Sequence, residues 1–419
     1  MTNYFDDKET ISPEERENDQ NRRLSRMVTL GYDHSERLKT ILDELGVNPA
    51  DIKSIHDLEK LPVISREEVV DLELRHPPFA GFCRNDADID RIFISPGPVY
   101  EPHLRENTLW ARGYFAAGFG KGDIVLNTFS YHMVAAGLTF HEGLRLTGAT
   151  VVPAGTSGTE MQVRLISDLG ITGYTGTPSF LMAVINKAEE MGHDFKKDFK
   201  LKKASFVAEP LLPPLRETFE NKYGIDTYQM YGATEVGDIA YECGGKNGWH
   251  ICEEVIIEIV DPATGKRVED GKLGEVVVTR LNDIFFLFRF GTGDLSSIIE
   301  EKCPCGRTSY RLNGIAGRVG DAVKVRGLFI APTQLKEISE KMGDIKFRIV
   351  ITRESYKDYV TAILEFEEGE AGSSAYHLEK RFGDLFQRIC TVKVNKILIE
   401  KPGAMTDYKV ILDKREWVS

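Results

Sequence analysis

No stretch of this sequence is apolar enough to cross a membrane, because none approaches the ~20 consecutive apolar residues that a spanning helix requires. The first residues, MTNYFDDKETISPEER, are acidic and contain no apolar signal segment. Internal repeats and low-complexity tracts are also missing. These absences predict a cytoplasmic protein without a membrane partner.

Positive charge is in the minority. Lysine and arginine number 53 against 65 aspartates and glutamates, which gives a formal net charge of −12. A nucleic-acid partner requires a basic face that displaces counterions, so none is expected. A nucleotide ligand is compatible with this charge, because one loop can bind phosphate inside an acidic protein.

Cysteine is scarce, with six in 419 residues, yet three of the six lie in two short segments that suit a metal site. Cys243 and His250 have the spacing C-x6-H, and Cys303 and Cys305 form a later C-x-C pair. If the two segments meet, three sulfurs and one imidazole form a closed tetrahedral site, which suits a structural Zn²⁺. The alternative is a set of free thiols in turns.

The order of apolar runs predicts an α/β protein of two or three domains. Residues 1–75 show helical periodicity, and residues 90–240 alternate short apolar runs with helix-length segments. The expected strands of the second region are Arg91–Ile94, Ile124–Asn127, Thr150–Val152, Gly173–Thr175 and Ala204–Val207. This rhythm is typical of a mostly parallel sheet covered by helices.

A β-rich subdomain is expected between residues 248 and 300, where short turns separate three further apolar runs. Its expected strands are Val255–Val260, Gly274–Thr279 and Ile284–Phe290. Glycines between residues 316 and 321 permit backbone freedom and indicate a domain boundary. We therefore expect a large N-terminal domain over 1–316 and a small, mobile α+β domain over 317–419.

The strongest local motif is Tyr231-Gly-Ala-Thr-Glu235, which follows an expected strand. A threonine hydroxyl can bond a phosphate oxygen, and a glutamate carboxylate can hold Mg²⁺. The alternative is a glycine turn followed by a helix cap. Two more motifs lie nearby in the sequence, at Val207-Ala-Glu-Pro210 and Phe288-Arg-Phe-Gly-Thr-Gly-Asp294, and loops that follow successive strands are where α/β sheets bind ligands.

Three ordered motifs resemble those of the adenylate-forming superfamily. Tyr231–Glu235 resembles its YGxTE motif, Arg289–Asp294 its (Y/R)xTGD motif, and Gly317–Asp321 its hinge motif. The segments Phe129-Ser-Tyr-His, Val152-Pro, Thr177-Pro-Ser, Ala208-Glu-Pro and Val325-Arg-Gly resemble the phenylacetate–coenzyme A ligase branch in order and spacing. The resemblance runs from about residue 90 to the end of the chain.

The resemblance implies a two-step reaction: a carboxylate attacks the α-phosphate of ATP to give an acyl-adenylate, and coenzyme A then displaces AMP after the C-terminal domain rotates. It implies that Thr234 contacts phosphate, that Glu235 binds Mg²⁺ and that Asp294 binds ribose. The other implied nucleotide-binding residues are Ala208, Glu209, Pro210, Tyr231, Gly232, Ala233 and Arg318. In isolation, Asp294 also fits a turn and Arg318 a surface salt bridge.

The resemblance also implies an acyl pocket, a hinge and partners. Tyr131, His132 and Gly137 would line the acyl pocket, although His132 also fits a hydrogen-bonded core histidine, and Gly320 would be the hinge. The expected partner is a carboxylic acid. We expect it to be aromatic, because phenylalanines and a tyrosine lie near this segment and would suit an aromatic ring. Some members of the branch carry a similar cysteine and histidine cluster, and relatives in it are often homodimers.

The sequence departs from the family pattern at the phosphate loop. The family reads S-S-G-T-T-G-x-P, whereas this chain reads Ser95-Pro-Gly-Pro-Val-Tyr-Glu-Pro102, which retains Ser95, Gly97 and Pro102. Its two new prolines remove backbone donors, and Glu101 adds a negative charge where polyphosphate would approach. Each lost charge-assisted bond costs about 1.5–3 kcal/mol.

The family's catalytic lysine is also displaced. Ungapped alignment places Thr406 at the lysine position, so Lys409 serves only if this loop is shifted. Both departures affect adenylation. Two functions stay open: an ATP-dependent acid–CoA ligase, or a relative that no longer adenylates and binds an acyl-adenylate, an acyl-CoA or an aromatic acid as a transferase or binding subunit.

Overall fold

The computed structural model describes residues 3–84, 86–95, 99–104, 109–326, 328–343, 345–354, 357–366, 375–405 and 409–415. The chain forms two compact units. The first comprises Met1–Glu258, Val277–Thr292 and Ile298–Asn313, and the second comprises Ile259–Val276, Gly293–Ser297 and Gly314–Ser419. The domain division at residue 316 stays a prediction.

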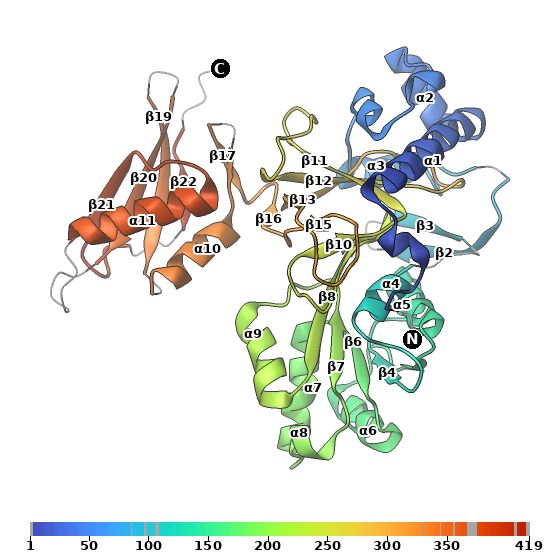
Figure 1. Cartoon of the computed structure of the whole chain (residues 1–419), viewed down its shortest axis with the longest axis horizontal. Coiled ribbons are helices and arrows are strands. Elements are labelled where there is room, and N and C mark those ends of the chain that lie inside the picture. Colours follow the sequence, from blue (N-terminus) through green and yellow to red (C-terminus); the bar gives the residue numbers. More distant parts are fainter. Residues whose placement is uncertain are drawn as a thin grey trace. The chain divides into compact units, whose positions relative to one another are not determined.

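The N-terminal region is helical, as its periodicity predicts (Figure 1). It contains α1 (Pro13–His34), α2 (Glu36–Leu45), α3 (Arg66–Arg75) and the 3₁₀ helices Asp7–Thr10, Pro49–Asp51 and Ile55–Lys60. Helix α1 begins at a capping box, in which the Ser12 and Glu15 side chains accept each other's backbone N–H groups. Leu24, Val28, Leu38 and Leu42 of α1 and α2 are buried in one apolar cluster.

A nine-stranded sheet forms the centre of the first unit, in the order β14-β15-β10-β9-β8-β7-β6-β4-β5. Its parallel strands are β4 (Ile124–Asn127), β5 (Thr150–Pro153), β6 (Gly173–Gly176), β7 (Lys203–Phe206) and β8 (Asp226–Ala233). The remaining strands, β9 (Gly237–Glu242), β10 (Trp249–Ile251), β14 (Ile298–Ile299) and β15 (Arg311–Leu312), pair antiparallel. The predicted βαβ series is therefore confirmed from residue 124 onward.

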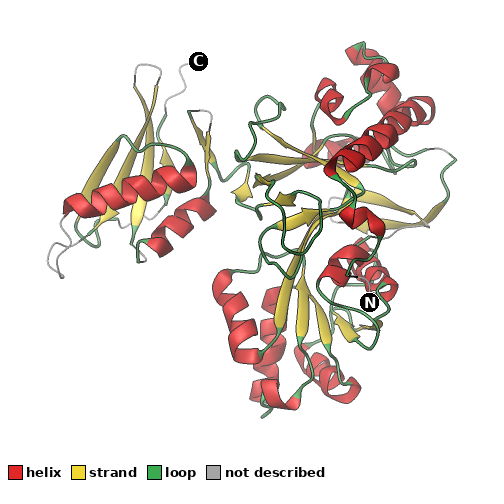
Figure 2. Cartoon of the chain, in the orientation of Figure 1, coloured by secondary structure: helices red, strands yellow, loops and turns green. Residues whose placement is uncertain are grey.

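Helices flank the parallel strands on either side (Figure 2). They are α4 (Ala111–Ala116), α5 (Ala135–Leu146), α6 (Thr159–Leu169), α7 (Pro178–Glu190), α8 (Phe195–Asp198), α9 (Pro213–Glu217) and the π-helical turn Thr218–Tyr223. The core between α6, α7 and the sheet is apolar or aromatic, with Leu126, Ile166, Tyr174 and Leu181 all buried. Continuous apolar strands are buried on both faces in this way.

The first expected strand of that series belongs elsewhere. Residues 91–94 lie in β2 (Ile89–Ser95), which pairs antiparallel with β3 (Val99–Leu104) in a separate two-stranded sheet. β2 ends at Ser95 and β3 begins at Val99, a spacing far shorter than the crossover that parallel strands require. The hairpin places Phe93 opposite Glu101 and Arg91 opposite His103.

A second sheet has the order β1-β13-β12-β11, with β16 beside β13. Its strands are β1 (Ile64–Ser65), β11 (Val255–Val260), β12 (Gly274–Arg280), β13 (Phe290–Ser296) and β16 (Gly317–Arg318). The strand expected over residues 284–290 is wrong except at its last residue. The Asn282 side chain accepts the N–H groups of Ile284 and Phe285 at 2.9 and 2.6 Å, which holds this segment in a turn.

The C-terminal part of the second unit is α+β, as expected. It contains β17 (Val323–Val325), β18 (Leu328–Ile330), α10 (Pro332–Lys341), β19 (Phe347–Glu354), β20 (Lys357–Glu365), α11 (Ala375–Cys390), β21 (Lys396–Glu400) and β22 (Ile411–Asp413). Four of these strands form a sheet in the order β21-β20-β19-β22. Phe347, Phe382 and Phe386 are fully buried in a core of their own.

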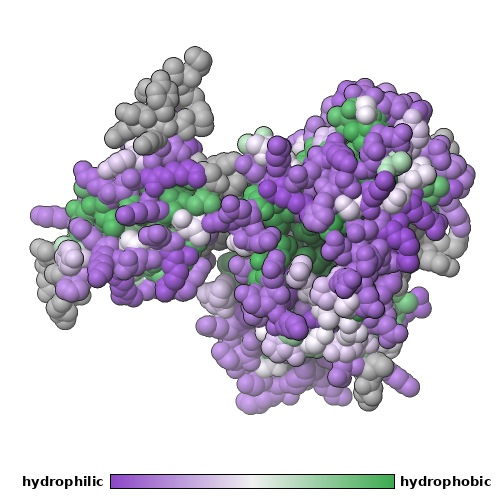
Figure 3. Space-filling view, turned by 45° about the horizontal axis from the view of Figure 1, so that its top comes forward, coloured by the Kyte–Doolittle hydropathy of each residue, from purple (hydrophilic) through white to green (hydrophobic). Residues whose placement is uncertain are grey.

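The face shown in Figure 3 is mostly hydrophilic, with apolar side chains in smaller areas. Exposed large apolar residues are spread over many elements; they include Leu45, Ile92, Met133, Met191 and Tyr376. Among the described residues, no helix is both long and apolar enough to span a bilayer.

Candidate active site

A pocket of about 230 Å³ lies in the first unit, where β4, β7 and β8 end. Most of its lining is apolar: Phe93, Val99, Leu109, Trp110, Phe129, Ala135, Phe140, Val207, Phe285 and Leu287 contribute. The polar lining residues include Glu73, Glu101, His103, Thr139, Thr234, Glu235, Arg280 and Asn282. The pocket thus occupies the carboxyl edge of parallel strands, where α/β sheets bind ligands.

The Thr234–Glu235 corner is a hairpin turn between β8 and β9, so the helix cap considered as an alternative is not formed. A glycine is required at position 232, because a Cβ there would lie 2.4 Å from the Gly237 carbonyl oxygen and 2.5 Å from the Trp110 ring. This close approach sets Ala233, Thr234 and Glu235 against the pocket wall.

The negative charge of Glu235 receives little stabilisation from the surrounding protein. Its side chain is 1 % exposed, and neither oxygen has a hydrogen-bond partner among the described residues. The cation beside it is Arg66, whose Nε lies 3.4 Å from Oε1. Burial raises the pKa of Glu235 above its ordinary value. A buried carboxylate with available lone pairs suits a hard cation such as Mg²⁺.

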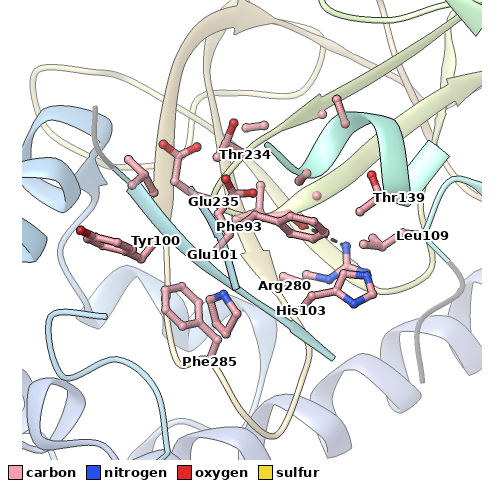
Figure 4. Close-up of a pocket in the computed structure, with 18 of the residues that line it drawn as sticks. Phe93, Tyr100, Glu101, His103, Leu109, Thr139, Thr234, Glu235, Arg280 and Phe285 are labelled. Carbon is pink, nitrogen blue, oxygen red and sulfur yellow. Dashed lines mark hydrogen bonds between the residues drawn. The ribbon is translucent and has the colours of Figure 1, made fainter. Parts of the chain in front are cut away.

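Two more carboxyl groups line the same side of the pocket, where Figure 4 places Glu101 near Glu235. The Ser95 hydroxyl donates to Glu101, and the Tyr100 N–H donates to Glu73 at 2.7 Å. Burial raises the pKa of Glu101 to about 8 and that of Glu73 to about 7, and the neighbouring carboxylates add to both shifts. Gly97 lies outside the described residues, so Ser95 and Pro102, which lines the pocket, represent the retained part of this loop.

The remaining nucleotide-binding candidates of the first unit are only partly gathered at the pocket. Ala208, Gly232 and Ala233 line it. Glu209 lies just beyond β7 and accepts a hydrogen bond from the Ser179 hydroxyl at 2.5 Å, and Pro210 follows it outside the pocket lining. Tyr231 packs on Trp249 with a ring separation of 5.8 Å.

Asp294, Arg318, Gly320 and Lys409 belong to the second unit. Asp294 on β13 faces Arg318 on β16 in the strand register, and an ion pair of 3.2 Å joins them. A Cβ added at Gly320 would meet no heavy atom of the described residues within 4 Å, so its surroundings are open. Lys409 is exposed just before β22, and Thr406 lies outside the described residues.

The three acyl-pocket candidates lie beside a different, shallow depression. Tyr131 and His132 line it together with Ser130 and residues 153–157. Gly137 packs against backbone, since a Cβ there would lie 2.3 Å from the Ser130 carbonyl oxygen. Their role in acid binding stays a prediction, while the larger pocket is lined by other residues of the same region, such as Phe129 and Ala135.

The predicted metal ligands meet in space. The donor atoms of Cys243, His250, Cys303 and Cys305 all lie within 4.8 Å of one another. The sulfurs of Cys243 and Cys303 are 3.6 Å apart, and Cys305 Sγ is 3.3 Å from His250 Nε2. The other imidazole nitrogen, Nδ1, lies 3.3 Å from the Ser309 hydroxyl. Three sulfurs and an oriented imidazole fit a closed zinc site.

The N-terminal segment packs on the loop that carries two of these cysteines. The buried Glu9 carboxylate accepts a hydrogen bond from Arg307 Nε at 2.6 Å, and its carbonyl accepts the Thr308 N–H at 3.0 Å. The Tyr4 hydroxyl donates to the Cys305 carbonyl at 3.2 Å. Residues separated by about 300 positions are therefore joined beside the cysteine and histidine cluster.

Sequence reasoning missed several pocket residues, among them Glu73, His103, Trp110 and Arg280. None of them belongs to a recognisable motif. A partial signal is present in the hairpin, because Phe93, Glu101 and His103 are alternate residues that share one face of β2 and β3. Recognising that face requires knowing the hairpin register.

Comparison with known proteins gives consistent matches. Residues 103–282 match the family model described as AMP-binding enzyme. A phenylacetate-coenzyme A ligase from Thermus thermophilus is 30% identical over 381 residues, which covers 87% of this chain and 84% of that protein. A phenylacetate-coenzyme A ligase from Aromatoleum evansii is 32% identical over 359 residues, which covers 82% of this chain and 80% of that protein.

The fold of this chain is also similar to that of solved structures. An open conformation of 2-hydroxyisobutyryl-CoA ligase in complex with 2-HIB-AMP and CoA has a TM-score of 0.81 at 25% identity, and the match covers 97% of this chain and 93% of that one. The same ligase in its postadenylation state has a TM-score of 0.71 at 25% identity, over 97% of this chain and 91% of that one. The α/β fold class expected from the sequence is confirmed.

Proposed function

Because this chain belongs to the phenylacetate–coenzyme A ligase branch of the adenylate-forming enzymes, we propose that it activates an aromatic carboxylic acid as an acyl-adenylate and transfers the acyl group to coenzyme A. In the first step a carboxylate oxygen attacks the α-phosphorus of ATP, and pyrophosphate leaves. In the second step the coenzyme A thiol attacks the acyl carbon, and AMP leaves.

The pocket at the ends of β4, β7 and β8 is the observation that carries this proposal. It combines the Thr234–Glu235 corner with aromatic walls from Phe93, Trp110 and Phe140. The apolar part suits the body of an aryl acid, and the polar corner suits the reacting carboxylate and phosphate. Its two ends thus correspond to the two parts of an acyl-adenylate.

We assign roles to the remaining candidates on the same basis. Thr234 would donate to the α-phosphate, and Glu235, with its buried oxygens, would hold Mg²⁺, which supplies positive charge to the triphosphate when bound. Asp294 would accept the ribose hydroxyls, Arg318 would stay close to the nucleotide through its ion pair with Asp294, and Lys409 would approach the phosphate from the C-terminal domain.

The cysteine and histidine cluster would bind a structural Zn²⁺. Four donors within 4.8 Å, with backbone N–H groups of Gly245 and Arg307 directed at the sulfurs of Cys243 and Cys305, support this assignment. A zinc ion there would join the loop after β9 to the loop after β14 and would take no part in the reaction. A cytoplasmic location and a homodimer complete the proposal.

Release of pyrophosphate tests the reaction directly. With ATP, Mg²⁺ and a panel of aryl acids, we expect turnover that Glu235→Gln abolishes, because the amide loses the charge that holds the cation. Glu217→Gln, at an exposed position on α9, is the matched control and should retain full activity. Calorimetric titration with AMP and with coenzyme A accompanies the assay.

One result would count against the role of Glu235, and another against the ligase assignment. Turnover that survives in Glu235→Gln would remove this residue from the reaction. Absence of pyrophosphate release with every acid, together with retained binding of AMP or coenzyme A, would identify a relative that has lost the first step.

A further inference from the structure

Arg66 is a cation beside the Thr234–Glu235 corner, and it belongs to none of the family motifs. Its Nε lies 3.4 Å from Glu235 Oε1, and among the described residues it is the only cation paired with this carboxylate. The two side chains differ in their access to solvent, because that of Glu235 is 1 % exposed and that of Arg66 is 40 % exposed. The guanidinium therefore lies on the open side of the corner, where a ligand can reach it.

Helix α3 brings Arg66 to this place. Arg66, Val69 and Glu73 are spaced i, i+3 and i+7, so they share one face of the helix. Val69 and Glu73 line the pocket, and Arg66, the first residue of α3, continues their row at one end. The capping box of Ser65 and Glu68 fixes the backbone at this point, so the position of Arg66 beside the corner is set by the fold.

The charge of Arg66 also acts on the segment that replaces the family's phosphate loop. Burial raises the pKa values of Glu235 and Glu101, and the positive charge of Arg66 opposes both rises. Glu101 belongs to residues 95–102, where two prolines remove backbone donors, and Figure 4 places it near Glu235. Arg66 is thus close to both the proposed Mg²⁺ ligand and the altered loop.

The Arg66 guanidinium has the donors that a phosphate group needs. Its five N–H groups form a planar fork, which matches two oxygens of one phosphate. Among the described residues the guanidinium donates no hydrogen bond, and both Glu235 oxygens lack a hydrogen-bond partner. In the proposed Mg²⁺ complex, Glu235 shares its charge with the cation, so its attraction for Arg66 weakens and the fork can turn to phosphate.

We propose that Arg66 binds the β- and γ-phosphates of ATP and supplies donors that residues 95–102 have lost. The inference rests on the proposed function and adds a binding residue to its first step, in which the same two phosphates leave as pyrophosphate. AMP lacks these phosphates, so its affinity should not depend on Arg66. A lysine at this position keeps the charge and loses the paired donors, so it should replace arginine only in part.

Calorimetric titration with AMP and with α,β-methylene-ATP, which cannot be cleaved at the bond that adenylation breaks, tests this in the presence of Mg²⁺. Arg66→Gln should weaken binding of the ATP analogue by about tenfold or more, as expected for lost charge-assisted hydrogen bonds, and should leave the AMP affinity within about twofold. Arg66→Lys should give an intermediate affinity for the analogue. Arg75→Gln, at the exposed opposite end of α3, is the matched control and should change neither affinity.

The outcomes separate this inference from the proposed function. If Arg66→Gln binds the ATP analogue as tightly as the unsubstituted protein does, or if its AMP affinity falls by the same factor, the inference is overturned while the proposed function stands. If the unsubstituted protein does not bind the ATP analogue, the first step of the proposed function fails and the inference fails with it. Circular dichroism and the thermal midpoint of Arg66→Gln show whether the variant is folded, and Arg66→Lys provides a second variant that keeps the charge.

Discussion

At the scale of single residues, the pocket concentrates carboxyl groups that cannot all be ionised. Glu73, Glu101 and Glu235 line one side, and Arg66 is the cation paired with Glu235. The Ser95–Glu101 hydrogen bond fixes a carboxyl group in the segment that the family uses for phosphate. Protons held at this site would reduce the repulsion that an incoming triphosphate meets.

These raised pKa values predict how stability changes with pH. Glu73 and Glu101 have an ordinary pKa of 4.5, which rises to about 7 and about 8 in the folded chain. Between these limits the folded protein binds more protons than the unfolded chain, so the free energy of unfolding falls as pH rises from about 4.5 to about 8. Glu101→Gln removes one of these titrating groups and should flatten the fall, as measured by urea denaturation at about pH 5.5 and about pH 8.

Glu217→Gln should leave the pH dependence unchanged, since this side chain is exposed. An equally steep fall in Glu101→Gln and in the unsubstituted protein would show that Glu101 is ionised in the folded state at neutral pH.

Individual pocket and cluster residues could be predicted from the sequence where they belong to a sequence motif. The sequence motif identified Thr234 and Glu235, and the spacing of cysteines and histidine identified a cluster whose donor atoms meet. Glu73 and His103 could not be found in this way. Each reaches the pocket through tertiary packing or strand register, and neither has a chemical partner nearby in the sequence.

At the scale of elements, apolar runs predicted the parallel strands, because a strand that is buried on both faces consists almost entirely of apolar residues. The hairpin of β2 and β3 was harder to predict from the sequence. Its strands place Arg91, Phe93, Glu101 and His103 on one face, so polar residues interrupt the apolar pattern. The segment 284–290 is apolar too, but the Asn282 side chain bonds its backbone, and Phe285 forms an isolated antiparallel bridge with Cys83 in place of a strand.

The proposed zinc site is tested at this scale, because the four candidate ligands bring two loops together. Protein purified without chelator should contain about one zinc per chain by elemental analysis, and Cys305→Ser should lower both the zinc content and the thermal midpoint, since loss of a thiolate ligand removes binding energy that stabilises the fold. Cys83→Ala, which changes a cysteine outside the cluster, should keep its zinc. A zinc content near zero in the unsubstituted protein would contradict the assignment.

At the scale of the whole molecule, the proposed reaction needs the C-terminal domain to change position between its two steps. Gly320 is the proposed hinge, and its open surroundings leave the backbone free to rotate. Gly320→Pro fixes φ near about −65° and should therefore slow the second step more than the first.

Two assays separate these steps. Exchange of labelled pyrophosphate into ATP reports adenylation and should stay within about twofold in Gly320→Pro, whereas thioester formation should fall by about tenfold or more, as expected when a gating rotation is hindered. Gly320→Ala, which adds a Cβ into open surroundings without fixing φ, serves as the control. Equal losses in both assays would place the effect in folding and not in rotation.

The hydrogen-bonded pair of Glu9 and Arg307 has a consequence for how the chain is made. The two residues are 298 positions apart, so the opening segment leaves the ribosome long before its docking surface has been synthesised. During that interval only part of its native surface exists: Asp6 can pair with Arg112 and Phe5 can contact Phe115, whereas the residues that bind Tyr4 and Glu9 have not been made. The contacts of Tyr4 with Cys305 and of Glu9 with Arg307 must therefore form late in maturation, after the loop with Cys303 and Cys305 has emerged.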